Sequence, residues 1–367
     1  MDYTSMPLKL LALTRYAKLG ASSRLRSYQY APAFAAAGIQ VDWSPLFDDP
    51  YILKLYREGR RQPLHVAAAY LKRLSALLRS HRYDLVWLEK ESLPWLPSLL
   101  DPGLLAKRAR YIVDYDDAVF HNYDQSASRL VRGFLHDKID AVMRRAELVV
   151  AGNPYLAQRA RDAHAPRVEI VPTAIDLDRY QVRGSSRNTG VVVGWIGTPS
   201  TQHMIQRLAP LLGSILDPTT DRLVTVGARF EEPLLPIHES RPWTEETEVD
   251  EIRRFDIGVM PLVDRPFERG KCGYKLIQYM ACGVPVVASP VGVNVNIVRS
   301  GDNGFLASSD DEWRRAIATL KADPTLRASM GSAGRALVEE KYCIQVTGPQ
   351  LVRLIGSTRN ELRDMTQ

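Results

Sequence analysis

Short apolar runs alternate along the chain with longer stretches of helical pattern. Runs this short, without polar alternation, are typical of parallel strands that are buried on both faces. The segments between them, such as VAAAYLKRLSALLRSH at 66–81, have the length and apolar spacing of helices. The alternation predicts a doubly wound α/β domain in the first half of the chain. The apolar runs there lie at 8–14, 39–43, 83–88, 110–115, 147–152 and 168–172.

The same rhythm returns after a polar stretch. Residues 181–190, QVRGSSRNTG, have the composition of an interdomain connection. We therefore expect a first domain over 1–182 and a second over 183–344. The segment 345–367 is expected to be a helix that returns to the first domain, although its pattern would also allow packing on the second. Apolar runs in the second half lie at 190–197, 221–227, 255–262, 284–290 and 304–307.

Composition adds a class of partner to this picture. The 367 residues carry a formal net charge of +6, which attracts nucleic acid, an anionic membrane or a phosphorylated substrate. The basic residues lack interleaved aromatic side chains and no nucleic-acid-binding module is present, so no nucleic-acid partner is expected. Cys272, Cys282 and Cys343 form no C-x-x-C pair, which argues against a disulfide framework or a zinc site.

No apolar run is long enough to span a bilayer or to act as a secretory signal, so we expect a cytoplasmic protein. The region 57–82 nevertheless combines an apolar stripe with many basic side chains. Such a region is either an ordinary surface helix or a peripheral contact with the anionic inner face of a membrane. Its basic residues are Arg57, Arg60, Arg61, Lys72, Arg73, Arg79 and Arg82.

The densest candidate chemistry lies in residues 269–292, RGKCGYKLIQYMACGVPVVASPVG. The pattern predicts a strand, a loop and then a helix over 271–282 that ends at Gly283. In parallel sheets such loops line ligand crevices, and a helix start carries a charge of about +0.5. Lys271, Lys275 and Gln278 would share one helical face, which suits a diphosphate followed by a ribose. The alternative is a solvated helix face.

Polar residues also follow the first predicted strand. Gly20, Ser22 and Ser23 lie where a backbone can approach a ligand, although Ser23 could instead be a helix N-cap. Arg24 and Arg26 are sited to neutralise a phosphate, with ordinary surface residues as the alternative. These positions are predicted to bind a phosphate or another substrate.

The segment DYDDAVFHNYD places several carboxylates after another predicted strand. We expect Asp116 and Asp117 to bind a substrate or to act in catalysis. With Asp114 and Asp124 they could instead hold magnesium or cap helices. His121 could donate to a sugar or a phosphate, or it could be structural.

The segment FDIGVMPLVDRPFERGKCGYKLIQYMACGVPVVASPVGVNVNIV resembles the donor-binding segment of glycosyltransferase family 4, retaining enzymes of the GT-B fold that use nucleotide sugars. The resemblance implies an α/β GT-B fold: two Rossmann-like doubly wound domains facing across a cleft. It further implies a donor held mainly by the second domain and an acceptor held mainly by the first. The first-domain candidates for binding the acceptor are then Gly20, Ser22, Ser23, Arg24, Asp116 and Asp117. The resemblance also implies no metal and no required cofactor. Similar segments, in the family's order, are GASSRLRSYQY, YIVDYDDAVFHNYD, AGNPYLAQRA, VPTAIDLDRY and GWIGTPST.

The resemblance also assigns residues of the donor site. Lys271 and Lys275 would neutralise the diphosphate, and Met260 and Pro261 would lie near the base. Two family glutamates, which touch sugar hydroxyls and the ribose, correspond to Gly270 and Gln278. A glutamine retains an oxygen that accepts from ribose hydroxyls, so Gln278→Glu is expected to preserve or tighten donor binding. The other predicted donor contacts are Gly197, Thr198, Ser200, Thr201, Gly273 and Glu268, the last of which could also be an exposed loop charge.

The predicted function is retaining transfer of a sugar from a UDP-sugar or GDP-sugar to an acceptor hydroxyl. The acceptor is expected to be a glycolipid, a lipid-linked oligosaccharide or a cell-surface polysaccharide precursor. The alternatives are a GT-B sugar-nucleotide epimerase and, because both glutamate positions differ, a nonenzymatic nucleotide-sugar-binding protein. The predicted catalytic residues are Lys275, Lys271, Asp116, Asp117 and His121.

Overall fold

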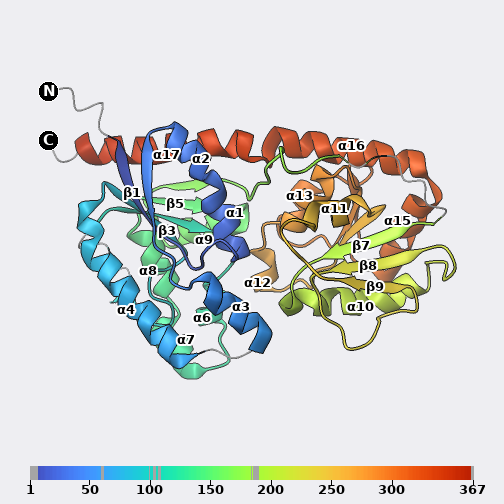
Figure 1. Cartoon of the computed structure of the whole chain (residues 1–367), viewed down its shortest axis with the longest axis horizontal. Helices are drawn as coiled ribbons and strands as arrows, with labels where there is room; N and C mark the ends of the chain where they lie inside the picture. Colours follow the sequence, from blue (N-terminus) through green and yellow to red (C-terminus); the bar gives the residue numbers. More distant parts are fainter. Residues whose placement is uncertain are drawn as a thin grey trace. The chain divides into compact units, whose positions relative to one another are not determined.

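The computed structural model describes residues 7–58, 62–98, 100–101, 105, 109–182, 184 and 190–364. The chain forms two compact units (Figure 1). The first runs to Thr173 and includes the segment from Thr347 onward, and the second is Ala174–Val346. Residues 183 and 185–189 of the predicted connection lie outside the described residues.

A parallel sheet forms the centre of the first unit, with strand order β2-β1-β3-β4-β5-β6. Its strands are β1 (Leu8–Leu13), β2 (Ile39–Trp43), β3 (Leu85–Glu89), β4 (Tyr111–Tyr115), β5 (Leu148–Ala151) and β6 (Val168–Ile170). Its helices are α1 (Ala21–Arg26), η2 (Tyr28–Tyr30), α2 (Ala31–Ala36), α3 (Asp49–Glu58), α4 (Pro63–Arg79), η3 (Ser80–Arg82), α6 (His121–Asp124), α7 (Arg129–Leu135), α8 (Lys138–Arg144) and α9 (Pro154–Asp162).

A second parallel sheet, of order β12-β11-β10-β7-β8-β9, forms the centre of the other unit. Its strands are β7 (Val192–Ile196), β8 (Arg222–Val226), β9 (His238–Arg241), β10 (Ile257–Met260), β11 (Val286–Ala288) and β12 (Gly304–Leu306). Its helices are η4 (Pro199–Thr201), α10 (Gln202–Gly213), α11 (Glu248–Arg253), α12 (Pro266–Arg269), α13 (Tyr274–Ala281), α14 (Asn294–Ile297), α15 (Asp310–Ala322) and α16 (Pro324–Lys341). The final helix, α17 (Ile344–Asp364), begins in this unit and continues into the first.

Both faces of the second sheet are buried. In β11, Val286 and Ala288 belong to a core cluster with residues of α11, α13, α14 and α16, whereas Val287 packs with residues of α10 and α15 on the other face. Alternate residues of one strand therefore serve two different cores, as expected where helices cover both faces. This confirms the predicted doubly wound architecture.

The structure differs from the sequence-based expectation in two places. Strand β9, HESR, was not predicted, because a polar edge strand shows no apolar run. The unit boundary lies ahead of residues 174–182, which were assigned to the first domain. Ile175 and Tyr180 are buried in the core of the second unit, so this segment is part of that unit.

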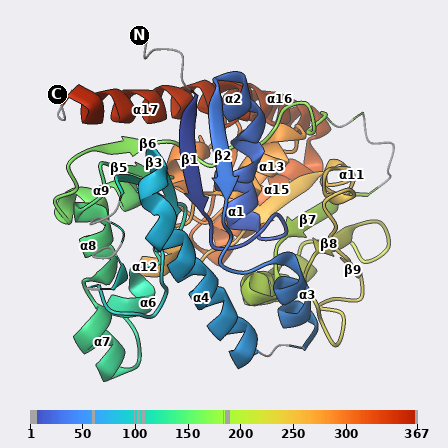
Figure 2. The same ribbon diagram turned by 60° about the vertical axis from the view of Figure 1, so that its left-hand side comes forward.

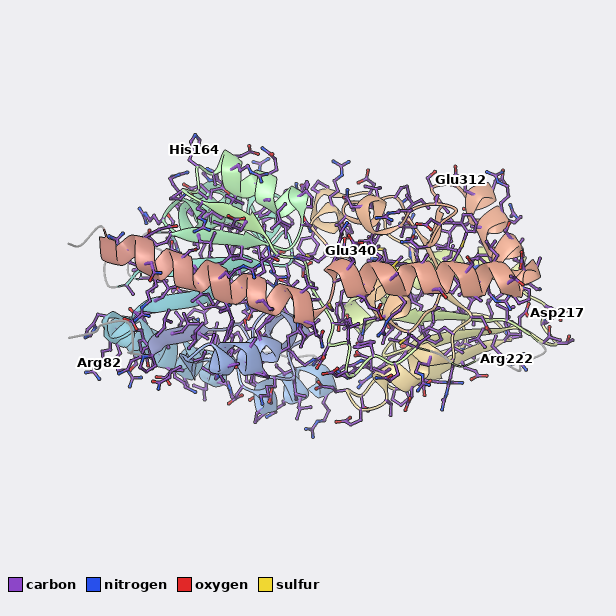
Figure 3. All side chains as sticks on the ribbon, turned by 90° about the horizontal axis from the view of Figure 1, so that it is seen from above. Arg82, His164, Asp217, Arg222, Glu312 and Glu340 are labelled. Carbon is purple, nitrogen blue, oxygen red and sulfur yellow. The ribbon has the colours of Figure 1, made fainter. Side chains whose placement is uncertain are left out.

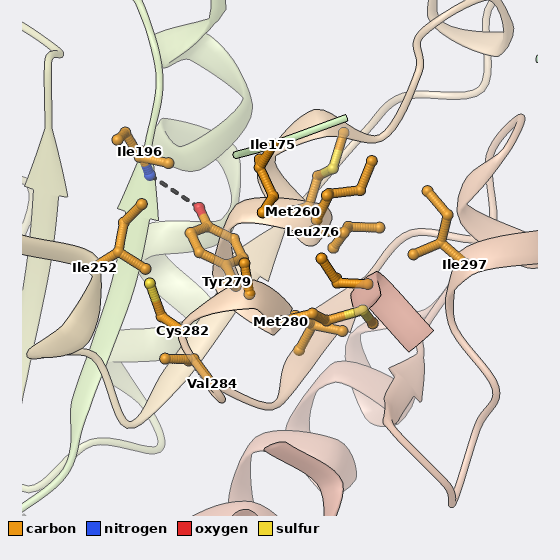
Figure 4. Close-up of a cluster of buried hydrophobic side chains, with 14 of the residues drawn as sticks. Ile175, Ile196, Ile252, Met260, Leu276, Tyr279, Met280, Cys282, Val284 and Ile297 are labelled. Atoms are coloured by element: carbon orange, nitrogen blue, oxygen red, sulfur yellow. Dashed lines mark hydrogen bonds between the residues drawn. The ribbon is translucent and has the colours of Figure 1, made fainter. Parts of the chain in front are cut away.

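Helix α13 ends as predicted but begins later than predicted. At its C-terminus Gly283 has φ +70°, and the amides of Gly283 and Val284 donate to the carbonyls of Met280 and Tyr279, the hydrogen bonds of a Schellman motif. The helix also packs tightly into its core: Tyr279 lies among apolar side chains, and its hydroxyl accepts from the Ile196 amide at 2.9 Å (Figure 4). Helix α13 is thereby fixed against β7 and β10.

Candidate active site

The start of α13 carries the two lysines that were predicted to bind a diphosphate. Lys275 lies in its first turn, and its Nζ is 5.6 Å from the centroid of the Trp195 ring on β7. Lys271 precedes the helix, and its Nζ is 5.1 Å from the centroid of the Phe267 ring on α12. Both cations are therefore held near the helix start, where the helix dipole adds positive potential.

The predicted helical face of Lys271, Lys275 and Gln278 is wrong for Lys271. Gly273, the N-cap of α13, has φ +66° and lies in the left-handed region, so the helix does not extend back to residue 271. A Cβ at Gly273 would lie 2.4 Å from Ile297 Cδ1. The loop that carries Lys271 therefore depends on a glycine for both its conformation and its packing.

The loop after β11 packs against the loop that carries Lys271. A Cβ at Gly292, where φ is +56°, would lie 2.4 Å from the Arg269 carbonyl oxygen, so the two loops pack backbone against backbone. Ser289 Oγ accepts from the Leu262 amide at 2.9 Å, and Asn294 Nδ2 donates to the Ser289 carbonyl at 3.0 Å. The loops at the carboxyl ends of β10 and β11 therefore form one connected rim.

The turn after β7 lies near Lys275, because Trp195 contacts both. A Cβ at Gly197 would lie 2.3 Å from the Trp195 ring, so only glycine fits there. Thr198 and Ser200 are exposed, and their hydroxyls lie 2.8 Å apart. Thr201 Oγ1 donates to the Thr198 carbonyl at 3.1 Å. These hydroxyls shape a polar turn at the same edge of the sheet as Lys275.

The other predicted donor residues differ in exposure. Gly270 is buried, and Pro261 and Glu268 are partly exposed. In the described part of the chain, the Glu268 carboxylate forms no hydrogen bond or ion pair. The Met260 side chain is buried in the core and is therefore a packing group. Gln278 is also buried, and its Nε2 donates to the Tyr180 hydroxyl at 2.8 Å.

In the first unit, Asp116 and Ser22 come together around a lysine that was not predicted. Lys90 Nζ lies 2.8 Å from Asp116 Oδ1 and donates to Ser22 Oγ at 2.8 Å. Ser22 in turn donates to Asp116 Oδ2. Burial would raise the pKa of Asp116, but the Lys90 charge and hydrogen bonds hold it below its usual value. Asp116 is therefore a carboxylate at neutral pH.

Lys90 itself has an uncommon backbone conformation, with φ +65°. Its amide donates to the Asp114 carbonyl at 2.9 Å, and its carbonyl accepts from the Tyr115 hydroxyl at 2.8 Å. Burial alone would lower the pKa of Lys90, but Asp116, Asp117 and Glu89 together raise it above its usual value. Strained backbones of this kind are concentrated at functional sites. The sequence signal was the charged triplet EKE at the end of a buried strand.

The remaining candidates of the loop after β1 point into the protein. Gly20 is the N-cap of α1, so the alternative that Ser23 caps the helix is wrong. Ser23 Oγ donates to Glu89 Oε2 at 2.6 Å, and burial raises the pKa of Glu89. Arg24 is buried and donates to the Lys18 carbonyl at 3.4 Å.

Arg26 pairs with Asp114 through two hydrogen bonds, of 2.6 and 3.0 Å, and both side chains are buried. The alternative that Arg24 and Arg26 are surface residues is therefore wrong. Arg26 also donates to the Val171 carbonyl at 2.8 Å. This pair joins α1, β4 and the segment after β6.

His121 and the acidic residues near it are engaged with other side chains. Its Nδ1 lies 2.8 Å from Asp124 Oδ1, and its Nε2 lies 2.9 Å from the Tyr155 hydroxyl. Arg159 also pairs with Asp124, at 3.2 Å. Within the described residues no group of His, Cys, Asp and Glu side chains has the arrangement of a metal site. A ligand would have to displace Tyr155 or Asp124 to reach the His121 ring.

Glycosyltransferases are among the known proteins that are similar to this chain in sequence and in fold. A family model described as "Glycosyl transferases group 1" matches residues 191–323. A GDP-mannose-dependent alpha-(1-6)-phosphatidylinositol monomannoside mannosyltransferase from Mycolicibacterium smegmatis is 25% identical over 346 residues, which are 85% of this chain and 88% of the relative. The Anabaena protein Alr3699/HepE, in its complex with UDP-glucose, superposes with a TM-score of 0.69 at 18% identity, covering 95% of this chain and 100% of that one. The chain is a glycosyltransferase with the GT-B fold, and its sequence is similar to the family 4 type.

A further relative matches a shorter part of the glycosyltransferase. A GDP-mannose-dependent monoacylated alpha-(1-6)-phosphatidylinositol monomannoside mannosyltransferase from Corynebacterium glutamicum is 34% identical over 86 residues. The aligned part is 23% of this chain and 23% of that relative.

Helix α4 of the glycosyltransferase has an apolar stripe on its exposed side. Figure 2 shows α4 as a long helix of the first unit. Leu64, Leu71 and Leu78 are 88%, 68% and 46% exposed and recur along it at a spacing of seven residues. Arg73, predicted to be part of the basic surface, is instead buried and donates to the carbonyls of Thr14 and Ser44. Arg60 and Arg61 lie outside the described residues. Across the described part of the chain, no helix is both long and apolar enough to cross a membrane.

Proposed function

We propose that this glycosyltransferase transfers a sugar from a nucleoside diphosphate sugar to an acceptor hydroxyl, with retention of anomeric configuration. The observation that carries the proposal is the start of α13, where Lys275 and Lys271 lie on aromatic rings beside a glycine-dependent loop. Cations at a helix start suit a diphosphate. GDP-sugars and UDP-sugars are the donors to try first, because relatives are named as GDP-mannose-dependent and a similar structure contains UDP-glucose.

The proposed chemistry is mainly electrostatic. As the glycosidic bond breaks, negative charge grows on the leaving diphosphate. Lys275, Lys271 and the helix start would stabilise that charge more than they stabilise the bound donor. In the first unit, Asp116 would accept a hydrogen bond from the acceptor hydroxyl while Lys90 and Ser22 hold its carboxylate in place. Asp117, whose charge acts on Lys90, is the second acceptor candidate.

A thermal-shift panel tests the donor site. UDP, GDP and ADP, each with and without a sugar, are added to the full chain at increasing concentration. A nucleotide at about 100 times its Kd should stabilise the protein by roughly 2.7 kcal/mol. A panel without any shift would overturn the proposal. Turnover without an acceptor would indicate an epimerase, and binding without turnover on any acceptor would indicate a nucleotide-sugar-binding protein.

We further propose that α4 brings the enzyme to a lipid-linked acceptor. Its exposed leucines would enter the interface of an anionic leaflet, and Lys72, Arg79 and Arg82 would lie near the headgroups. Arg82 projects outward from the ribbon (Figure 3). The relatives named above act on phosphatidylinositol mannosides, which are anionic glycolipids.

Co-sedimentation with vesicles tests this docking. Binding should require anionic lipid and decrease with salt, because exposed charges are screened over about 8 Å at physiological ionic strength. Replacing Leu64, Leu71 and Leu78 by serine should abolish it. A matched control replaces the exposed leucine and phenylalanine of α7, Leu130 and Phe134, by serine. Equal binding to neutral vesicles, or retained binding by the α4 variant, would contradict the proposal.

A further inference from the structure

A buried hydrogen-bond network of polar side chains links Gln278 to Glu248 in the second unit. Gln278 Nε2 donates to the Tyr180 hydroxyl at 2.8 Å, and that hydroxyl donates to Glu248 Oε1 at 2.6 Å. Trp243 Nε1 donates to Glu248 Oε2 at 2.7 Å, and Arg179 pairs with Oε1 at 3.3 Å. Gln278, Tyr180 and Glu248 are only 2%, 1% and 3% exposed.

The direction of each hydrogen bond in this network follows from the chemistry of the side chains that form it. An indole N–H and a guanidinium can only donate, so Glu248 is the acceptor. Burial, with the nearby Tyr274 and Glu248, raises the pKa of Tyr180 well above its usual value, so the phenol stays protonated and donates its hydrogen bond to Glu248. The Tyr180 oxygen is then an acceptor, which selects the amide nitrogen of Gln278 as its partner.

The position of the Gln278 amide oxygen is thereby fixed as well. With Nε2 turned to Tyr180, the only remaining polar atom of the Gln278 side chain is Oε1, an acceptor. Among the described residues, no protein group donates to it. A glutamate at this position could not donate to Tyr180. It would also compete with Glu248 for the single Tyr180 proton.

We infer that Tyr180 and Glu248 are positioning residues for the donor: they orient the Gln278 amide so that its oxygen accepts hydrogen bonds from the ribose hydroxyls of the nucleotide. This inference rests on the proposed function, since it assumes that a nucleoside diphosphate binds beside α13. It reverses the expectation for Gln278→Glu, which should now weaken the binding of the ribose hydroxyls. The site is built for a neutral amide, and two residues outside the predicted donor-binding segment enforce it.

Calorimetric titration of the full chain tests the inference. UDP and GDP are compared with their 2′,3′-dideoxy analogues. The wild type should bind the ribonucleotide about 10-fold more tightly, as expected for one hydrogen bond that the analogue cannot make. Tyr180→Phe should reduce this ratio to less than about 3-fold by weakening only the ribonucleotide. A protein that is merely misfolded would bind both nucleotides more weakly, so unchanged affinity for the dideoxy analogue is the specific signature.

A matched control variant and a double variant that exchanges Gln278 and Glu248 complete the test. Tyr83→Phe removes a tyrosine–carboxylate hydrogen bond of 2.7 Å to Asp42 in the first unit and should leave the ratio unchanged. Gln278→Glu should abolish the higher affinity for the ribonucleotide and so bring the ratio close to one. Adding Glu248→Gln should restore it to within about 3-fold of wild type, because the introduced amide can then donate to Tyr180 and Tyr180 to the new carboxylate.

The outcomes separate this inference from the proposed function. If neither diphosphate binds the wild type, the proposed function fails and the inference fails with it. If a diphosphate binds but the wild type does not discriminate against its dideoxy analogue, only the inference fails. A wild-type ratio that survives Tyr180→Phe would likewise overturn the inference alone.

Discussion

At the scale of single residues, the role of a charged side chain depends on the groups that it contacts. Lys275 and Arg73 are both basic residues on amphipathic helices, yet one lies on a ring at a helix start and the other is buried against backbone carbonyls. Burial lowers the pKa of Arg73 to about 10. Nothing in the local sequence separates these two roles, because the partners come from distant strands.

Lys275→Ala should reduce turnover more than donor binding. Charge on the leaving diphosphate increases towards the transition state, so the loss in kcat should correspond to about 2–4 kcal/mol and exceed the loss in binding. Steady-state kinetics and titration with the same nucleotide sugar measure the two quantities. Lys341→Ala, an exposed lysine on α16, is the control. Unchanged turnover by Lys275→Ala would show that this lysine is only a solvated charge.

Lys90→Met should destabilise the first unit in a manner that depends on pH. The folded pKa of Asp116 lies below its usual value, so its contribution is present at neutral pH and is lost as pH falls through that folded value. The raised pKa of Lys90 contributes stability that is fully present below its usual value near 10.4 and is lost only as pH rises towards the folded value, so it adds no change between pH 3 and pH 7. The stability gap between variant and wild type should therefore be about 3–5 kcal/mol at pH 7 and smaller at about pH 3.

Hydrogen exchange of β3 and β4 during urea unfolding measures this gap within the first unit. Arg110→Met removes an exposed pair with Glu147 and should cost at most about 1 kcal/mol. A gap that stays constant between pH 7 and pH 3 would show that Lys90 stabilises the fold by packing rather than by its charge.

At the scale of elements, the strands and the end of α13 were predictable because apolar runs and a C-terminal glycine are local signals. Gly283 acts through its own φ and its nearest carbonyls. The start of the same helix was not predictable. Gly273 was placed inside the helix, but contact with Ile297 and a left-handed φ stop the helix there. Strand β9 was missed because its pairing with β8, not its polar sequence, makes it a strand.

Gly273→Ala should destabilise the second unit by about 1–3 kcal/mol and weaken diphosphate binding. The expected causes are a left-handed residue with a side chain and a Cβ that lies 2.4 Å from Ile297 Cδ1. Gly301→Ala separates these causes, since its φ is +88° with no atom within 4 Å of the added Cβ. Adding Ile297→Val to Gly273→Ala should recover part of the loss. Equal stability of the Gly273 and Gly301 variants would exclude the steric contribution.

At the scale of the whole molecule, two units of similar architecture divide the candidate chemistry between them. The residues proposed for the donor lie in the second unit, and those proposed for the acceptor lie in the first. The donor residues were predictable because they share one contiguous motif. Lys90, Tyr180 and Glu248 were not predicted, since each gains its importance from a partner far away in the sequence.

The later part of α17 should be essential to the first unit and dispensable for the second. Residues 347–364 pack in the first unit, where Leu351, Leu354 and Ile355 are buried and Thr347 contacts the Tyr30 hydroxyl at 2.9 Å. Losing three such side chains removes about 5–9 kcal/mol, which is comparable with the entire stability of a domain. Truncation after Val346 should therefore unfold the first unit, even though the deleted residues follow the second unit in the sequence.

Limited proteolysis with hydrogen exchange tests this expectation. The first unit should lose protection, while the second keeps its protection and its thermal shift with UDP or GDP. Ile355→Ala in the full chain is the milder variant and should cost the first unit about 2–5 kcal/mol. A truncated protein whose β1, β3 and β4 amides remain protected would show that α17 only covers the first unit. The expected loss would mean that the integrity of the first unit depends on a helix that follows the second unit in the sequence.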